Sequence, residues 1–360
     1  MLSSEDQLRI QVMLHNEPKA LRIDENQMVL YAWTTNGEAS IPLSPNLPNE
    51  QYLKALREML SEHVLGSAGG YPLYLKRWSR MGHTGEQHLE QFLLLGEPEA
   101  VVAVANSPAL TIELAKLVWW AVTNTAQQAE QGLHMLRRGC VIEDALGREI
   151  AQFLMEHLPF VTEPEEVLSI LSAVLQEGLL EEAQIEKIWR RSQERGKGIY
   201  QIAFLQGRPL ALPEPVEAYP ALEQLLDHTE GGVAEKLKQL ASSGGQTFVA
   251  QSIALLDKVA NEVSVYALMN AIGSFFVTLL PSMPAQRQLQ EVNLVPLLAE
   301  VDEVPEALRS QLEALFFLAH VREEVTFKAI LHSGSVGRSL RKKLKPEFDL
   351  IRSHLQRLQP

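Results

Sequence analysis

A cluster of glycines at residues 66–70 stands just before several positively charged side chains, a combination that could bind an anion. Pro72 favours the first turn of a helix here, because its fixed φ suits that position. The N-terminus of a helix offers free amide donors and positive potential, and both attract anions. No Gly-Lys-Ser/Thr follows, so the stretch is not a P-loop, and the cations begin about a turn or more beyond the glycines. The alternative is a flexible joint followed by a solvated basic face. The candidate anion- or partner-binding residues are Gly69, Gly70, Lys76, Arg77 and Arg80.

A second basic patch lies near the C-terminus and contains no acidic residue: Arg338, Arg341, Lys342 and Lys343. Cations in the last turn of a helix commonly interact with its free carbonyls and its dipole, which is the structural interpretation. The functional interpretation is a docking surface for an acidic protein or for RNA. The patch has no aromatic side chain on which a base could stack, which weakens the RNA hypothesis.

Cys140 is the only cysteine, so the chain can form neither an internal disulfide nor a thiolate cluster for zinc or iron–sulfur. Arg137 and Arg138 precede it, and nearby cations favour a reactive thiolate, so a sulfur-carrying thiol is one hypothesis. The favoured alternative is a small residue buried in the core.

Other catalytic signals are weak. The ten histidines include no His-Glu-x-x-His motif or other tight metal spacing. Ser335 stands in an approximate nucleophile-elbow pattern, but Ser333 replaces its first glycine and the preceding stretch has a helical pattern. Trp119 and Trp120 would lie about 100° apart on a helix, so that one packs inside and the other edges a groove. We therefore predict no catalytic residue, no metal and no cofactor.

Composition narrows the class of partner. With 46% hydrophobic residues the chain can form large cores, and its net charge of −13 argues against DNA or an anionic membrane as a main partner. The N-terminal sequence lacks the pattern of a signal peptide, and a single cysteine suits a reducing compartment, so we expect a cytoplasmic protein. Residues 263–286 are uncharged and long enough to span a bilayer. Their polar residues recur every fourth position, which favours a helix buried among other helices over a membrane span.

Sequence patterns predict a mainly α-helical chain with a small N-terminal α+β cap. Strands are expected at 20–24, 27–33 and 38–43, with Asn36-Gly37 as a hairpin turn. A helix over 4–15, opened by a capping box at Ser4, competes with a strand, since Leu8, Ile10 and Val12 alternate. From residue 85 onward short capped helices follow one another, as in a HEAT-like or variant-repeat, α-solenoid-like array. The predicted domains are 1–64 (cap), 65–208 (helical repeats), 209–220 (proline-rich linker) and 221–360 (C-terminal helices).

Three runs carry a resemblance to a known family: RIDENQMVLYAW at 22–33, REMLSEHVLGSAGGYPLYLKRWSRMG at 57–82 and GEPEAVVAVANSP at 96–108. They resemble the DsrS family, soluble proteins encoded alongside the reverse-acting dissimilatory sulfite reductase of sulfur-oxidising bacteria. The resemblance implies a cytoplasmic role tied to sulfur oxidation. It implies no agreed reaction and no catalytic residues, so no site residue is transferred.

We therefore predict a non-enzymatic interaction or regulatory factor of the sulfur-oxidation (Dsr) system, with a protein partner of that system. Two alternatives stay open. One is a sulfur carrier or an enzyme that uses Cys140 or a cofactor held beside Trp119 and Trp120. The other is RNA binding through the C-terminal basic patch.

Overall fold

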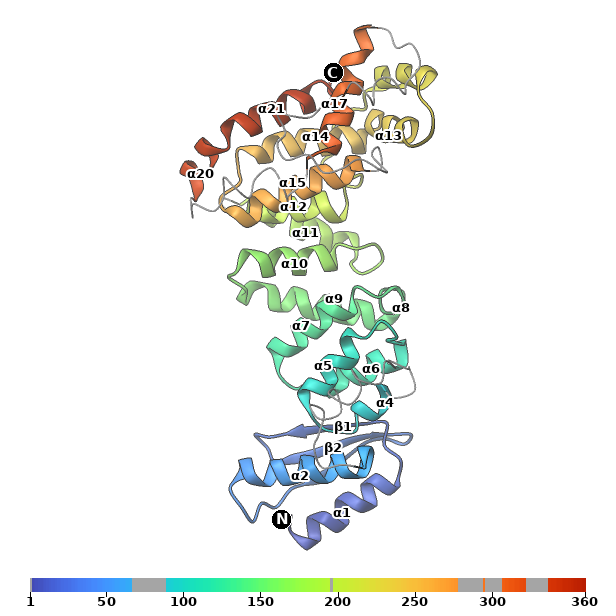
Figure 1. Cartoon of the computed structure of the whole chain (residues 1–360), viewed down its shortest axis with the longest axis vertical. Helices are drawn as coiled ribbons and strands as arrows, with labels where there is room; N and C mark the ends of the chain where they lie inside the picture. The colour runs from blue at the N-terminus through green and yellow to red at the C-terminus, as the bar shows by residue number, and fades with distance from the viewer. Residues whose placement is uncertain (1, 67–88, 195–196, 278–293, 295–305, 322–335) are drawn as a thin grey trace. The chain divides into compact units, whose positions relative to one another are not determined.

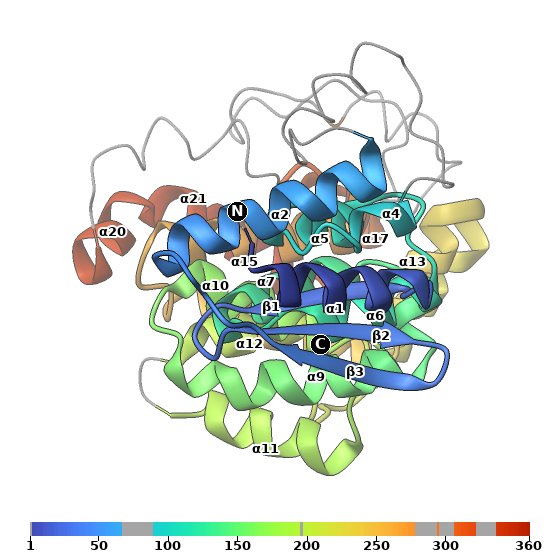
Figure 2. The same cartoon turned by 90° about the horizontal axis from the view of Figure 1, so that it is seen from below.

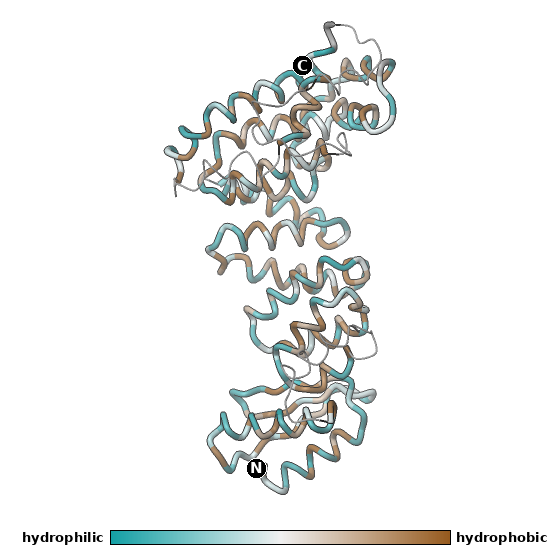
Figure 3. Tube along the Cα trace, viewed as in Figure 1, coloured by the Kyte–Doolittle hydropathy of each residue, from teal (hydrophilic) through white to brown (hydrophobic). Residues whose placement is uncertain are grey.

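The chain is mainly helical and carries a small antiparallel sheet near its N-terminus (Figure 1). The structure is a computed structural model that describes residues 2–66, 89–194, 197–277, 294, 306–321 and 336–360. The chain divides into two compact units, Met1–His157 and Leu158–Pro360. This division differs from the predicted domain boundaries. Along the helices, hydrophobic and hydrophilic stretches alternate (Figure 3), as expected where one side of each helix packs inward.

The sheet of the first unit has the order β1 (Ala20–Asp24), β2 (Val29–Thr34) and β3 (Gly37–Pro42). At the first turn the Asp24 carboxylate accepts hydrogen bonds from the backbone N–H groups of Asn26 and Gln27. At the second turn Gly37 adopts a φ of +105°, a left-handed conformation that glycine tolerates best. The three predicted strands are thus confirmed, with ends shifted by at most two residues.

Helices α1 (Ser4–His15) and α2 (Asn49–Leu65) cover one face of the sheet (Figure 1, Figure 2). The helical interpretation of the N-terminal segment is confirmed, but the predicted cap is wrong. The cap is Ser3, whose Oγ accepts a hydrogen bond from Asp6 N at 3.1 Å. The core between these helices and the sheet includes Ile10, Met13, Leu21, Leu30, Ile41, Leu56 and Leu60.

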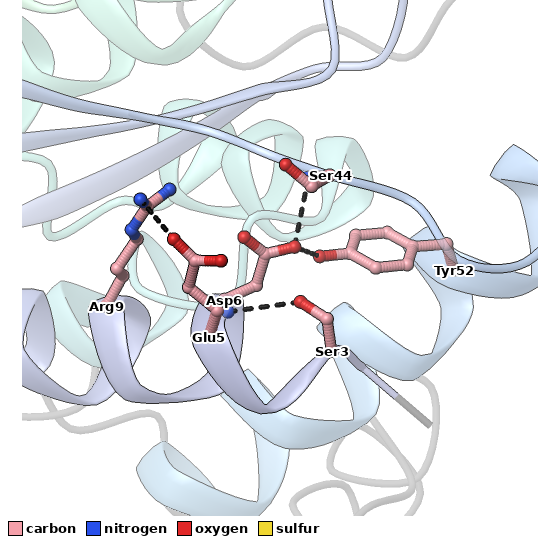
Figure 4. Close-up of polar contacts among 6 residues, drawn as sticks. All are labelled: Ser3, Glu5, Asp6, Arg9, Ser44 and Tyr52. Atoms are coloured by element: carbon pink, nitrogen blue, oxygen red, sulfur yellow. Dashed lines mark hydrogen bonds and ion pairs between the residues drawn. The ribbon is translucent and has the colours of Figure 1, made fainter.

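A buried carboxylate ties α1 to α2 (Figure 4). Asp6 is fully buried, and its Oδ2 accepts hydrogen bonds from the Tyr52 hydroxyl and, at 3.0 Å, from Ser44 N. Burial by itself would raise the pKa of Asp6, but these hydrogen bonds outweigh it and hold the pKa below its usual value. Burial and the same carboxylate raise the pKa of Tyr52. The pair is therefore ionised Asp6 and protonated Tyr52 at neutral pH.

We expect Tyr52→Phe to lower the free energy of unfolding by about 2 kcal/mol. The substitution removes the tyrosine hydroxyl, which donates a hydrogen bond to the buried Asp6 carboxylate, and leaves Ser44 N as a donor to Oδ2. The stabilisation that Asp6 contributes should be present above its unfolded pKa of about 4 and be lost as the pH falls below that value. Urea unfolding at pH 7 measures the difference. Tyr31→Phe is the matched control, since no hydrogen bond of the Tyr31 hydroxyl occurs among the described residues. Equal unfolding midpoints for the two variants would contradict the role of the pair.

The remaining helices of the first unit follow in chain order. The stretch 139–157 forms two helices separated at Glu143 and Asp144, where the Asp144 carboxylate accepts from Leu146 N and caps the second helix. The helix after Ser107 is capped by Thr111, whose Oγ1 accepts from Leu114 N. The bounds are α4 (Leu89–Phe92), α5 (Pro98–Asn106), α6 (Ile112–Ala121), α7 (Thr125–Met135), α8 (Gly139–Ile142) and α9 (Ala145–His157).

The described part of the second unit is helical. Its first elements are η2 (Leu158–Phe160), α10 (Pro164–Val174), α11 (Glu182–Ser192), α12 (Gly198–Gly207) and η3 (Pro220–His228). They are followed by α13 (Gly231–Ala241), α14 (Ser243–Leu256), α15 (Glu262–Phe276), α17 (Glu306–Ala319), α20 (Gly337–Lys343) and α21 (Lys345–Gln356).

The proline-rich segment predicted as a linker, 209–220, lies inside the second unit. It has no helix before η3, as its prolines predict, yet it packs on the unit. Val216 N donates to Thr247 Oγ1 at 2.9 Å, and Tyr219 N donates to Ala241 O at 2.8 Å. Leu212 is buried.

Helix α15 occupies most of the described part of the uncharged stretch. Val265, Leu268, Ile272 and Phe276 are fully buried, and its polar positions are more exposed, as Ser274 is. Among the described residues no helix combines the length and the apolar character that crossing a membrane requires.

Candidate functional site

The sheet face opposite α1 and α2 carries an arginine between two aromatic rings. The Arg22 guanidinium carbon lies 4.5 Å from the centroid of Tyr31 and 4.8 Å from that of Trp120. Register places Arg22 directly opposite Tyr31, and side chains on one face of a sheet stand together at such positions. Arg22 also donates to Trp120 O at 3.1 Å and to Glu38 Oε2 at 3.3 Å.

Adjacent tryptophans of α6 take different positions, as their spacing predicts. Trp119 is buried and its Nε1 donates to Glu149 Oε1 at 2.8 Å. Trp120 turns to the sheet, where its Nε1 donates to Glu38 Oε2 at 2.6 Å and its ring lies 5.6 Å from that of Trp33. Together Arg22, Glu38 and Trp120 fix the 120–124 connection against β1.

Beside this cluster lies a polar cavity of about 380 Å³, which we call the first-unit cavity. The turn between β1 and β2, one side chain of α2, the start of α5, the connection between α6 and α7, and α7 itself form its wall. Its polar lining residues include Arg22, Asp24, Glu25, Asn26, Arg57, Glu97, Asn124, Gln127 and Gln131. Gly96, with a φ of +63°, makes the tight start of α5 in this wall.

Gln131 is the most unusual side chain of the first-unit cavity. It is 0% exposed, and in the part of the chain that the structure describes neither its Oε1 nor its Nε2 has a hydrogen-bond partner. The Nε of Arg22, which also lines the cavity, is likewise buried without a partner. Buried polar groups are nearly always hydrogen-bonded, so these three atoms call for a partner that the described residues do not supply.

The carboxylates around the cavity are mostly engaged. Glu25 forms an ion pair with Arg57, whose Nε also points to Gly96 O at 3.5 Å. Asp24 accepts the backbone hydrogen bonds that close its turn. The arrangement offers two donor atoms, Gln131 Nε2 and Arg22 Nε, and one acceptor atom, Gln131 Oε1, for recognition. It is suited to binding a polar group, and its carboxylates are held as structural anchors.

No protein-family model, curated protein or solved structure matches this chain.

The first predicted site, Gly69, Gly70, Lys76, Arg77 and Arg80, lies outside the described residues. In the basic patch, Arg338 and Lys342 are exposed, and Arg341, Lys342 and Lys343 form the last turn of α20. Arg341 Nη1 donates to Val259 O at 2.8 Å, so this cation fixes the segment after α14. A docking test on the patch should therefore use Arg338 and Lys342 and leave Arg341 in place.

The expected burial of Cys140 is wrong. The thiol is exposed near the start of the short helix α8, and its Sγ lies 3.5 Å from Leu110 O as a weak donor. Apolar burial was favoured by residue type alone, whereas the chain places Val141 of the same helix inward. Among the described residues no group of three or more histidine, cysteine or acidic side chains lies close enough to hold a metal.

Proposed function

We propose that this chain is a non-enzymatic interaction or regulatory factor that binds a polar group of its partner in the first-unit cavity. The observation that carries the binding role is the buried, unpaired carboxamide of Gln131. An unsatisfied buried amide costs about 1–3 kcal/mol. A ligand that presents both an acceptor and a donor would remove that cost on binding.

The proposed setting is cytoplasmic sulfur oxidation with the reverse dissimilatory sulfite reductase system. Its support is the resemblance of the three runs to the DsrS family. Each run contributes to the wall of the first-unit cavity: Arg22 to Asn26 from the first, Arg57 from the second, and Gly96 to Pro98 from the third.

We further propose that the helices form a HEAT-like or variant-repeat array that presents the cavity to a protein partner. Neighbouring helices support this, since α5 packs on α6 and α7, and α7 packs on α9. In the second unit α12 packs on both α10 and α11. Stacked helices give extended surfaces of the kind that grip protein partners.

Replacing Gln131 by Leu tests the binding role. We expect Gln131→Leu to raise the free energy of unfolding by about 1 kcal/mol, because an unpaired amide is replaced by an apolar group of similar size. We also expect components of the sulfite reductase system to co-purify with the wild type from sulfur-grown cells and not with the variant. Gln128→Leu, on the same helix outside the cavity lining, is the control and should retain them. Equal recovery with all three proteins, or destabilisation by Gln131→Leu, would refute the proposal.

The exposure of Cys140 supports a second candidate, a sulfur carrier. In that role the Cys140 thiol would take the terminal sulfur of a donor persulfide, giving a persulfide on Cys140 and a free thiol on the donor. After incubation with a small-molecule persulfide and removal of excess reagent, mass spectrometry should then find one added sulfur on the wild type and none on Cys140→Ser. A Cys140→Ser strain that oxidises sulfur at the wild-type rate would eliminate this candidate.

A further inference from the structure

A second cavity, of about 210 Å³, lies in the second unit at the start of α12. We call it the second-unit cavity. Its wall is built from η2 and the start of α10, the last turn of α11, the first turn of α12, and the connection between α14 and α15. Five elements that are separate in the sequence thus meet around one small space.

Among the described residues that line the second-unit cavity, three side chains are positive, Arg191, Lys197 and Lys258, and none is a carboxylate. Among the described residues none of the three forms an ion pair; Lys258 Nζ donates to Gln201 Oε1 at 3.1 Å. Unneutralised cations in a concave, partly enclosed wall concentrate positive potential. The carboxylate of Glu194 lies near enough to Tyr200 to raise the pKa of that hydroxyl, but Glu194 is exposed and does not line the cavity.

The first turn of α12 adds uncharged donors to this wall. Gly198 and Ile199 stand at the start of a ten-residue helix, where backbone N–H groups have no intrahelical partner. Lys197 precedes them and supplies no side-chain cap. Helix starts of this kind attract anions through their amides and their dipole.

Tyr200 provides an independent sign that a ligand is expected. Its side chain is 2% exposed, it lines the second-unit cavity, and its hydroxyl has no hydrogen-bond partner in the described part of the chain. Arg191 and Lys197 lie over its ring, at 5.9 Å and 5.2 Å from the centroid. Burial raises the pKa of Tyr200, although Arg191 acts in the opposite direction, so the hydroxyl remains a donor at neutral pH.

The wall opposite α12 is held in place by its own hydrogen bonds. The Ser264 hydroxyl accepts from the backbone N–H groups of Ala260 and Asn261. Gly337 N donates to Ala260 O at 2.7 Å, and Arg341 binds the neighbouring Val259 O. Lys258 is therefore carried by a fixed segment, and the cavity needs no rearrangement to present its charge.

We propose that the second-unit cavity binds a small oxyanion of the phosphate or sulfate type, either free or as the phosphoryl group of a nucleotide. Its free groups are donors: two ammonium groups, a guanidinium, helix amides and a phenol. An oxyanion accepts hydrogen bonds from all of these, and multiple charge-assisted bonds are strong. The site lies in a different unit from the first-unit cavity and takes a ligand of different chemistry, so either proposal can fail without the other.

Isothermal titration of the full-length protein tests the proposal, with inorganic phosphate, sulfate and adenosine 5′-monophosphate as probes. We expect saturable binding of at least one probe, weakened about tenfold by Lys197→Ala and several-fold by Tyr200→Phe. Lys187→Ala removes the same charge from an exposed position of α11 and should leave binding unchanged. Tighter binding of the nucleotide than of phosphate would identify a phosphoryl group as the ligand, and equal or weaker binding a free anion.

Two outcomes would overturn the site. The first is the absence of saturable binding of every probe to the wild type. The second is an equal loss with Lys197→Ala and Lys187→Ala, since that pattern reports overall charge. Unfolding midpoints of the variants, measured in probe-free buffer, establish that each has folded.

Discussion

Lowering the pH from 7 to 4.5 should cost the second unit about 2–3 kcal/mol of stability through one histidine, His354 of α21. His354 is buried and stacks on Phe317 of α17, with 3.9 Å between ring centroids. Burial lowers the pKa of His354 to about 4, and the positive charge of Arg357 acts in the same direction. The His354 imidazole is therefore neutral in the folded protein at pH 7.

The direction follows from proton binding. Between about pH 6.5 and pH 4 the unfolded chain holds a proton on His354 that the folded chain does not. The unfolded state is thus favoured as the pH falls, and the contribution of His354 is fully present only above its unfolded pKa. The Asp6 carboxylate, whose pKa is lowered, begins to lose its contribution only below about pH 4, so the two effects occupy different ranges.

Comparing the wild type with His354→Phe isolates the effect. Phenylalanine retains a ring against Phe317 and cannot take up a proton. Urea unfolding of both proteins at pH 7 and pH 4.5 should show a loss in the wild type that is about 2–3 kcal/mol larger than in the variant. Other groups, including the half-buried His134 of the first unit, titrate in both proteins and cancel in the difference. Equal losses in both proteins would show that His354 is accessible to protons in the folded state.

Local signals made the N-terminal cap predictable. Its strands are delimited by turn residues, and Asn36-Gly37 fits the hairpin turn between the second strand and the third. Helix positions were also largely predictable, because apolar side chains recur at helical spacing. The residues that cap individual helices were harder to predict. Ser3 and Ser4 are equally suitable by residue type as the N-cap of α1, and the chain geometry selects Ser3.

The candidate sites depend on contacts that no local pattern contains. Arg22 and Gln131 come from β1 and α7, and only the fold brings them to one cavity. In the sequence Gln131 looks like any other polar residue of a helix. Only its burial in the folded chain marks it as a candidate binding residue. Likewise Arg191, Lys197 and Lys258 are scattered in the sequence, whereas the cations predicted as sites were those that are adjacent in it.

The proline-rich segment illustrates the same limit. Proline excludes helix locally, so the prolines predict a non-helical segment. They do not indicate the surface on which that segment packs. That surface is the first turn of α14. A Cβ atom on Gly244 would overlap the carbonyl group of Leu210, with its carbonyl carbon at 3.0 Å. Glycine at position 244 is thus required for this close packing.

Gly245→Ala should be the most damaging single-methyl change in the described part of the second unit. Helices α13 and α14 meet at Ser242, which ends the first and caps the second. A Cβ atom on Gly245 would collide with Gln239 O and stand 2.6 Å from Leu240 Cα. Both are main-chain atoms of α13, so relief requires the two helices to move apart. The adjacent Gln246, whose Nε2 donates to Leu240 O at 2.8 Å, would lose its alignment as well.

We expect Gly245→Ala to lower the free energy of unfolding by about 3 kcal/mol or more, since overpacking against fixed backbone lies at the upper end of such effects. Gly198→Ala is the matched control: its Cβ atom would meet Lys258 at 3.6 Å, an ordinary contact, and alanine suits a helix better than glycine. Its unfolding midpoint in urea should stay within the range of ordinary surface changes. If Gly245→Ala unfolds at the same urea concentration as the control, then glycine at position 245 is not required for the close approach of α13 and α14.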